Sequence, residues 1–420
     1  MIQLLEYLSY ITLFICLIVL TSYLYIKFKF GFWMIQPVFH IYDIQYMISP
    51  PGIINHGLPK KNKYTNFKNI ETIEYANVSD LKVNQFVKFI QMNYLNHKDN
   101  KFSPKNENIA PYFYGHSSKS FFSFYNEEQL YSDVKKGTII NDNKIVGVMT
   151  SRPVHIVINN GDNEAKFDVY YVDYLCVHKS FRKKGIAPQL IQTHHYNQSQ
   201  LNKNIHVSLF KREDELTGIV PLCVYSTYGF SVNTWTKPMD LLSIYKLVEI
   251  NAQNFYLLIN FINDNSNKFD IVIYSEFTNL IELIKTKNVF IYTIVFNTEI
   301  VCAYFFRKTC VFVEKDLEVL SCFASINNLP IESKVKSKKG KSKQNNNNND
   351  IFIQGFKISF WKISFENYFG YAALEDISDN NIIIDNLSLK TKPMIISPTA
   401  YFFYNFAYKT FAAEKCLIVI

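Results

Sequence analysis

The chain has 420 residues, of which 48% are hydrophobic and 16% aromatic, so it has room for large buried cores and for two or three domain-sized units. Part of its formal net charge of +8 comes from a Lys-rich stretch near position 340. Because the charge is partly local, we do not interpret it as a nucleic-acid-binding surface. The seven cysteines are odd in number and show no C-x-x-C spacing. We therefore expect reduced thiols, no metal and no nucleic-acid partner.

The chain begins with a long apolar run. Residues 7–26 contain no charged side chain, and about 20 apolar residues are enough to cross the hydrocarbon core of a membrane. Glu6 precedes the run, and Lys27 and Lys29 follow it, which is unlike a cleaved signal peptide. The sequence predicts a retained N-terminal transmembrane helix, single-pass, with the rest of the protein on the cytoplasmic side. A buried N-terminal helix is the alternative.

A helix and a hairpin are expected in the next part of the chain. Apolar residues from Val78 to Tyr94 recur at helical spacing after polar, cap-like residues. The segments Lys144 to Ile158 and Phe167 to Cys176 have strand-like composition and are joined by a polar turn. His155 lies on the first of these strands. A lone strand histidine is more often structural than a general base, because a base needs a partner within reach and the sequence shows none.

The most informative stretch runs from Val172 to Gln192. A β-branched and aromatic run leads into a basic turn and then into apolar residues at helical spacing, which predicts a strand, a phosphate-binding loop and a helix. Gly185 and Ala187 leave room for a close backbone approach, and the basic residues from Arg182 supply positive charge beside free helix N–H groups. Alone, R-x-x-G-x-A is a weak signal, because basic residues beside a glycine are more often a solvated turn.

The second half of the chain, beyond Pro238, alternates between helical and strand patterns. Residues 332–350 are rich in Lys and Asn and predict a disordered insertion. We expect a helix at Phe255–Phe261 and strands at Asp270–Tyr274, Val289–Phe296, Ile300–Phe306, Phe352–Phe365, Tyr401–Tyr408 and Cys416–Ile420.

Three ordered stretches resemble signatures of one family. Tyr174 to Pro188 resembles N-F-L-C-V-H-K-x-L-R-x-K-R-x-A-P of the glycylpeptide N-tetradecanoyltransferases, or N-myristoyltransferases, which are GNAT-like acyltransferases. Phe32 to Val38 is similar to the family's F-W-x-T-Q-P-V, and Ala413 to Ile420 is similar to its ending A-E-K-V-G-L-V-L. The resemblance implies an α+β fold in which two GNAT-like halves form a large, mostly antiparallel, saddle-shaped sheet flanked by helices.

The resemblance also implies a division of the chain and an activity. Residues 1–28 would be the membrane anchor, residues 29–238 the lobe that binds acyl-CoA, and residues 239–420 the lobe for the peptide substrate. The implied reaction transfers a myristoyl (tetradecanoyl) group from myristoyl-CoA to the N-terminal glycine amine of proteins or peptides. The family transfers the acyl group directly, so Cys176 is not favoured as an acyl carrier.

The resemblance assigns roles to particular residues. In the family the chain terminus lies in the centre of the sheet, so the Ile420 carboxylate would accept a proton from the peptide ammonium, whose reference pKa is about 8. Backbone N–H groups of Tyr174 and Leu175 would stabilise the oxyanion of the attacked thioester. The residues implied to contact acyl-CoA are Gly31, Phe32, Trp33, Tyr174, Leu175, Cys176, Val177, Arg182, Lys183, Lys184, Gly185, Ile186 and Ala187.

Two stretches depart from the family pattern. The family's acidic loop N-Y-V-E-D-D-D-N-M-F keeps only Asp99 here, because Asn96 to Lys98 replace the other carboxylates, which should weaken recognition of a substrate lysine. Phe210 to Glu213 stands where the family has Y-T-A-G, whose threonine helps to receive the substrate amine. Two alternatives therefore stay open: a non-catalytic acyl-CoA-binding protein, and a GNAT-type N-acetyltransferase for another amine. The C-terminal carboxylate favours the enzyme, because a scaffold has no need of it.

Overall fold

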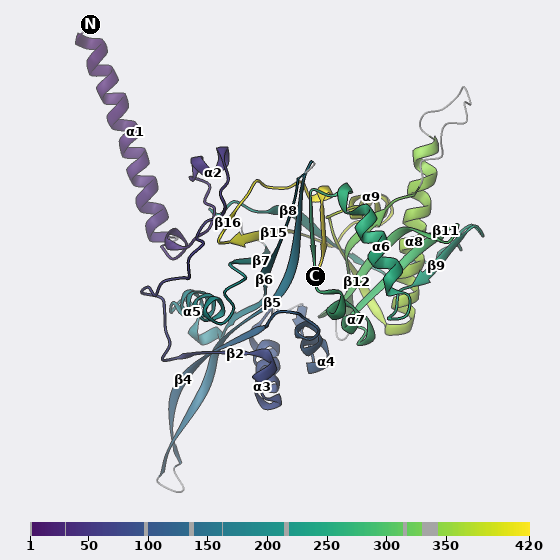
Figure 1. Cartoon of the computed structure of the whole chain (residues 1–420), viewed down its shortest axis with the longest axis horizontal. Helices are drawn as coiled ribbons and strands as arrows, with labels where there is room; N and C mark the ends of the chain where they lie inside the picture. Colours follow the sequence, from purple (N-terminus) through teal and green to yellow (C-terminus); the bar gives the residue numbers. More distant parts are fainter. Residues whose placement is uncertain are drawn as a thin grey trace.

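The computed structural model describes residues 2–29, 31–95, 100–133, 138–161, 163–213, 218–313, 317–329 and 343–420 (Figure 1). Its helices are α1 (Ile2–Lys29), α2 (Ile44–Ile48), α3 (Asp80–Asn93), α4 (Asn106–Ile109), α5 (Ile186–Leu201), α6 (Phe255–Asn265), α7 (Phe277–Lys285), α8 (Lys343–Asn367) and α9 (Asn380–Lys390). Its strands are β1 (Gly52–Ile53), β2 (Ile70–Glu74), β3 (Asn100–Phe102), β4 (Phe121–Asp133), β5 (Thr138–Asn160), β6 (Asn163–Val177), β7 (Val207–Glu213), β8 (Cys223–Ser231), β9 (Tyr245–Glu249), β10 (Ile271–Tyr274), β11 (Val289–Phe296), β12 (Glu299–Val313), β13 (Leu317–Asn327), β14 (Phe369–Glu375), β15 (Ile395–Tyr404), β16 (Phe406–Ala407) and β17 (Cys416–Val419).

One large mixed sheet contains nearly all the strands of the described ranges. Its main path runs β17-β10-β5-β6-β7-β15-β8-β14-β13-β12-β11-β9, and β4, β2 and β3 pair with it outside this path. Neighbouring strands are antiparallel except for the parallel pairs β10–β17, β6–β7 and β13–β14. The predicted α+β fold with a mostly antiparallel sheet is confirmed, and its saddle shape stays a prediction.

The first half of the sheet carries helices on both faces. On β4, Phe124 packs against α3, whereas its neighbour Ser123 bonds to His194 of α5. Successive side chains of a strand point to opposite faces, so α3 and α5 cover opposite faces of the sheet. Helix α5 approaches β5 closely because Gly147 has no side chain, since a Cβ there would lie 2.8 Å from Leu190 Cδ1.

The second half is built in the same layered way. On β12, Tyr304 and Phe306 pack in a core with α8 and α9, whereas Ala303 and Phe305 pack in a core with α6 and α7. The alternation again places the two helix pairs on opposite faces. Both halves of the chain therefore have the layered helix–sheet–helix arrangement that the resemblance implied.

The strand predicted from Phe352 to Phe365 is wrong, because this segment lies in helix α8. Phe352, Phe356, Phe360 and Ile363 are buried and recur every three or four residues. This helical period, rather than the high aromatic content, decides the local structure.

The predicted disordered insertion lies only partly within the described residues. Residues 343–350 form the first part of α8, and the later part of this helix packs its apolar residues into the core. Residues 332–342 lie outside the described ranges. The boundary between lobes at 238/239 stays a prediction.

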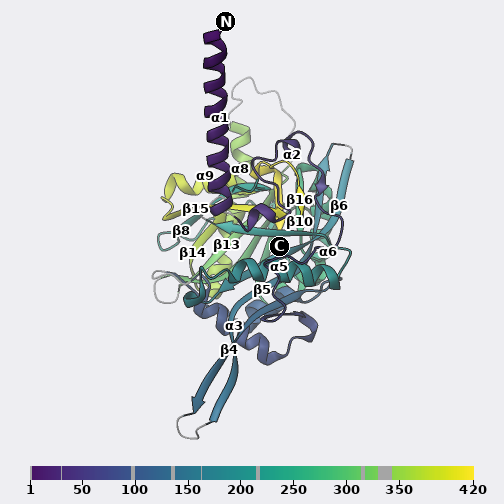
Figure 2. The ribbon, with the colours of Figure 1, turned by 90° about the vertical axis from the view of Figure 1, so that its left-hand side faces the viewer.

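The end of the chain lies inside the molecule. Strand β17 pairs in parallel with β10, from Ile271↔Cys416 to Tyr274↔Val419, and it also lies beside β13. Ile420 is only 4% exposed. Figures 1 and 2 both place the C-terminus within the body of the protein, where strands of the two halves meet.

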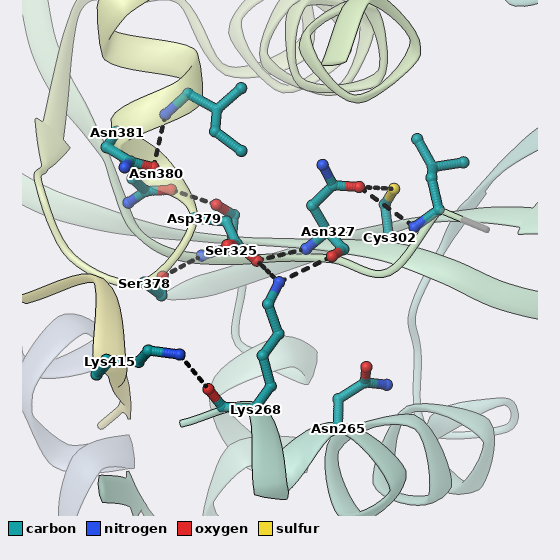
Figure 3. A network of polar contacts seen from close by, with 12 residues as sticks. Asn265, Lys268, Cys302, Ser325, Asn327, Ser378, Asp379, Asn380, Asn381 and Lys415 are labelled. Atoms are coloured by element: carbon teal, nitrogen blue, oxygen red, sulfur yellow. Dashed lines mark hydrogen bonds and ion pairs between the residues drawn. The ribbon is translucent and has the colours of Figure 1, made fainter. Parts of the chain in front are cut away.

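A polar network fixes the segment that leads into β17 (Figure 3). The Lys268 ammonium donates to the Asp379 carboxylate and to the Asn327 carbonyl, 2.8 Å away, and the Asn327 N–H donates to the same carboxylate at 2.7 Å. Lys415 donates from Nζ to the Lys268 carbonyl at 3.4 Å, and the Asp270 N–H donates to the Lys415 carbonyl at 2.8 Å. These contacts hold the start of β17 against the α6–β10 connection and against β13.

Helix α1 extends away from the body (Figures 1 and 2). Its residues from Ile11 to Tyr25 are all exposed, although most of them are apolar. No helix in the described part of the chain is long and apolar enough to cross a membrane, so the predicted transmembrane helix is not supported.

Candidate functional site

The basic turn between β6 and α5 presents an open helix N-terminus. Gly185 is the N-cap of α5 with φ 75°, in the left-handed region that glycine adopts without strain. A Cβ at this position would meet nothing within 4 Å, so the space in front of the helix is open. Lys183 and Lys184 are exposed beside it. Free N–H groups, the helix dipole and two ammonium groups together suit an anion such as a phosphate.

Arg182 holds this turn in place. Its Nη2 donates to the Asn93 carbonyl at 2.8 Å, and its Nε donates to the Val177 carbonyl at 3.2 Å. The Lys179 N–H donates to the Asn93 side chain at 3.4 Å. Arg182 therefore ties the turn to the ends of α3 and β6, which leaves Lys183 and Lys184 as the outward-facing charges.

Strands β6 and β7 diverge at the predicted oxyanion residues. Their parallel pairing runs from Val169↔Val207 to Val172↔Phe210. On the other side of β6, the register with β5 shifts between Met149 and Ser151. Beyond Val172, the residues Asp173, Tyr174 and Leu175 no longer pair with β7, although Leu175 still pairs with Met149 of β5.

Two cavities lie beside the point where β6 and β7 diverge, and they border each other there. The first, here called the α5 cavity, has a volume of about 320 Å³ and lies between β6, β7 and α5, with Trp33, Met149, Leu175, Ile191 and Phe210 in its wall. The second, here called the central cavity, has a volume of about 440 Å³ and is lined by residues of both halves, including Tyr174 and Ile420. Tyr94, Asp173 and Lys211 border both cavities.

A buried ion pair links the oxyanion strand to the strand beside the C-terminus. Nε of Arg152 donates to Asp173 Oδ2 at 3.0 Å, and its Nη1 donates to Ser275 Oγ at 2.7 Å. The Ser275 N–H donates to the Val419 carbonyl at 3.0 Å. Burial raises the pKa of Asp173, although Arg152 opposes the shift. The arrangement fixes the position of Ile420 relative to β6.

A second charged cluster forms another wall of the central cavity. Glu375 accepts from Lys211 at 3.3 Å, from Arg307, and from the Tyr225 hydroxyl at 2.5 Å. Burial favours the neutral carboxyl, but Lys211, Arg307 and Tyr225 outweigh it and hold the pKa of Glu375 at about 2. Lys211 belongs to the stretch that departs from the family pattern, and its ammonium is directed into this cluster.

Several residues predicted to contact acyl-CoA instead have a structural position. The Cys176 side chain is buried in the core under α3, and burial raises the pKa of its thiol to about 12, so it is protonated at neutral pH. Val177 pairs with Gly147 of β5. Ile186 packs into the core below α5, and Ala187 lies half-buried in the first turn of that helix.

In the aromatic motif near the N-terminus, one residue lines a cavity and the others have structural positions. Trp33 lines the α5 cavity. The Phe32 ring is buried edge-on against Trp33 and Tyr64, and Gly31 precedes this pair. Only the third residue of this predicted group therefore reaches the cavity.

His155 has partners that the sequence did not reveal. Its Nδ1 lies 2.7 Å from Asp168 Oδ1, and its Nε2 lies 2.9 Å from Glu276 Oε2. Burial alone would lower the pKa of His155, but the bonds to the two carboxylates raise it. His155 is not part of the wall of either cavity, which argues against it as the general base.

Sequence reasoning missed Arg152, Asp173, Arg307 and Glu375 as site residues. Arg152 and Asp173 lie at strand positions between uncharged residues, and a charge in such a place is the signal that was available, whereas Arg307 and Glu375 each have a charged neighbour in the sequence. Their partners come from strands far apart in the chain, so the clusters themselves are not readable from the sequence. The Asn96–Asp99 stretch lies outside the described residues, and the weakened preference for a substrate lysine stays a prediction.

Comparisons with known proteins agree with this fold. Residues 58–223 match the family model of Myristoyl-CoA:protein N-myristoyltransferase, N-terminal domain. No curated protein matches the sequence. One structure of the Saccharomyces cerevisiae N-myristoyltransferase with bound myristoyl-CoA is 12% identical, with a TM-score of 0.66 over 92% of this chain and 94% of that chain. Another structure of the yeast enzyme is 13% identical, with a TM-score of 0.69 over 92% and 89% of the two chains.

The strand, the basic turn and the helix, together with the divergence of β6 and β7, lie within the part of the chain that matches this family model. At these identities the yeast structures establish the shared fold, and the match over residues 58–223 shows that this part of the chain is similar to the N-terminal domain of the N-myristoyltransferases. The resemblance to the N-myristoyltransferases is thereby confirmed.

Proposed function

We propose that this protein transfers a myristoyl group from myristoyl-CoA to the N-terminal glycine amine of proteins or peptides. The observation that carries the proposal is the meeting of the two cavities at Asp173, next to Tyr174 and Leu175, with Ile420 in the wall of the central cavity. The yeast enzyme that shares the fold was solved with myristoyl-CoA, which supports the same donor here.

The donor would lie across the turn and the α5 cavity. Its pyrophosphate would rest on the N-terminus of α5 beside Lys183 and Lys184, and its acyl chain would fill the α5 cavity between Met149, Ile191 and Phe210. An acetyl group would leave that apolar space largely empty. The cavity therefore favours a long acyl chain over the N-acetyltransferase alternative.

The acceptor amine would approach through the central cavity. The Ile420 carboxylate would accept a proton from the ammonium, and the neutral nitrogen would attack the thioester carbon. The resulting oxyanion would accept hydrogen bonds from the Tyr174 and Leu175 N–H groups until the carbon–sulfur bond breaks. The CoA thiolate would leave and take up the proton that the nitrogen loses as the amide forms. Arg152 would keep Asp173 in place beside these donors through the bond described above.

Mass spectrometry of the reaction products tests the proposed function. The full-length protein would be mixed with tetradecanoyl-CoA or acetyl-CoA and with peptides that begin with a free or an N-acetylated glycine. We expect a tetradecanoyl adduct on the free-glycine peptide alone. Binding of tetradecanoyl-CoA without any product would indicate the non-catalytic alternative, and acetylation with no tetradecanoyl transfer would indicate the N-acetyltransferase.

We also propose that α1 holds the protein at a membrane, with the catalytic body on the cytoplasmic side. The exposed apolar residues along α1 and the basic residue Lys27 at its end support this proposal, because such a helix gains free energy at a lipid interface. We expect the full-length chain to sediment with phospholipid vesicles, and a variant lacking residues 1–28 to stay in the supernatant while it still binds tetradecanoyl-CoA. Equal sedimentation of both proteins would contradict the role of α1.

A further inference from the structure

We propose that Trp33 forms the end wall of the acyl-chain pocket and thereby limits the length of the acyl chain. The inference deepens the proposed function and rests on it, because it takes the α5 cavity as the place of the acyl chain. The observation behind it is a third cavity, here called the α1 cavity, which lies on the other side of Trp33.

The α1 cavity lies between the end of α1 and the body. Its volume is about 640 Å³, and its wall includes Tyr25 of α1, Met34, Tyr42 and Ile219. Within the described part of the chain, Trp33 is the residue that lines both this cavity and the α5 cavity. Trp33 therefore lies at the boundary between the smaller α5 cavity and the larger α1 cavity, and in this proposal its indole is the partition between them.

The partition is held by contacts on several sides. The indole stacks on Phe210 at 5.9 Å with an interplanar angle of 15°, and it meets Phe32 edge-on at 5.0 Å. His40 Nε2 lies 3.0 Å from the Trp33 carbonyl oxygen. Because ring and backbone are both held, the indole cannot move aside without breaking these contacts.

The wall of the α5 cavity at Tyr404 leads into packed protein, whereas the side at Tyr94, Asp173 and Lys211 borders the central cavity, where the acceptor peptide would bind. Tyr404 is buried, with its hydroxyl bonded to Gln36 Oε1 at 2.6 Å and its ring against His195. The thioester end of the chain is fixed by the donors at Leu175. Because the thioester end lies on the side of the central cavity, the far end of a longer chain would gain room if the partition at Trp33 is removed.

Calorimetric titration with dodecanoyl-, tetradecanoyl-, hexadecanoyl- and octadecanoyl-CoA tests the inference. For the full-length wild type we expect affinity to fall at least about tenfold from tetradecanoyl-CoA to octadecanoyl-CoA, since one methylene in a defined pocket changes discrimination by about 10–200-fold. Trp33→Ala should abolish this fall, because the chain can enter the α1 cavity. Trp33→Phe keeps a ring and should shift the preference only to hexadecanoyl-CoA.

Two matched variants distinguish the loss of the partition at Trp33 from a mere enlargement of one cavity. Met149→Ala widens the α5 cavity without opening it to the α1 cavity, and Ile219→Ala widens only the α1 cavity. Both should keep the wild-type fall toward octadecanoyl-CoA. If Met149→Ala abolishes the fall as completely as Trp33→Ala does, volume alone sets the length and the inference is overturned.

The outcomes also distinguish this inference from the proposed function. If the wild type binds tetradecanoyl-CoA and Trp33→Ala keeps the wild-type profile, the inference fails and the proposed function stands. If the wild type binds none of the acyl-CoA molecules, both fail. If Trp33→Ala does not fold, as judged by its thermal unfolding curve, Trp33→Phe decides, and an unchanged profile for that variant overturns the inference.

Discussion

Adding a few residues after Ile420 is expected to stop turnover while leaving the binding of acyl-CoA intact. The extension would move the carboxylate proposed as the proton acceptor out of the central cavity, whereas the phosphate-binding turn and the oxyanion donors lie on other elements. General-base contributions are about 10²–10⁴-fold, so we expect a loss of that order in the single-turnover rate. Calorimetry with tetradecanoyl-CoA would report the unchanged donor binding.

The control must account for the buried position of the chain end. Val419→Ala removes buried side-chain volume from β17 but keeps the carboxylate at Ile420. It should therefore lower the thermal unfolding temperature while leaving the turnover rate near that of the wild type. Wild-type turnover by the extended protein would show that the base is another group in the central cavity. His155 would not be that group, because it lines neither cavity.

Gly185→Glu is expected to weaken the binding of acyl-CoA by about 10–100-fold. The variant places a carboxylate at the N-terminus of α5, where the pyrophosphate would accept hydrogen bonds, and a charge-assisted hydrogen bond contributes about 1.5–3 kcal/mol. The positive φ of this residue adds strain for any other side chain. Titration with tetradecanoyl-CoA at low and high salt would separate the electrostatic part from the rest.

Gly161→Glu is the matched control for this variant. Gly161 lies at the turn between β5 and β6, has φ 64°, and is also open, since a Cβ there would meet nothing within 4 Å. The control therefore adds the same charge and comparable strain at the opposite end of β6. An equal loss of affinity in both variants would remove the phosphate-binding role of the turn, and Gly185→Ala would show how much of the loss is strain alone.

Local features of the chain were predictable where one segment determines its own structure. The helix α3, the hairpin of β5 and β6, the phosphate-binding turn and the terminal strand β17 follow from residue patterns within single stretches. Helix α8 was missed because its aromatic content indicated a strand, although Phe352, Phe356 and Phe360 have helical spacing.

The polar part of the site was not predictable for a different reason. Glu375 meets Lys211 and Arg307 only because β14, β7 and β12 come from distant parts of the chain. The partners of His155 arise in the same way, since Glu276 follows β10. A local sequence pattern carries no information about such contacts, and they depend on the order of strands in the sheet.

The interleaving of strands from the two ends of the chain has a consequence for how the protein folds. Strand β15 (Ile395–Tyr404) pairs with β7 through Tyr401↔Lys211, so β7 lacks this neighbour until the last part of the chain has been made. Strand β5 likewise lacks β10 (Ile271–Tyr274), which it pairs with through Ile271↔Ile158, until the second half of the chain is under way. Contacts of such high sequence separation slow folding. During synthesis β5 and β7 would expose unpaired edges, which are prone to association with other chains. The protein is therefore expected to need chaperone protection until the ribosome releases it.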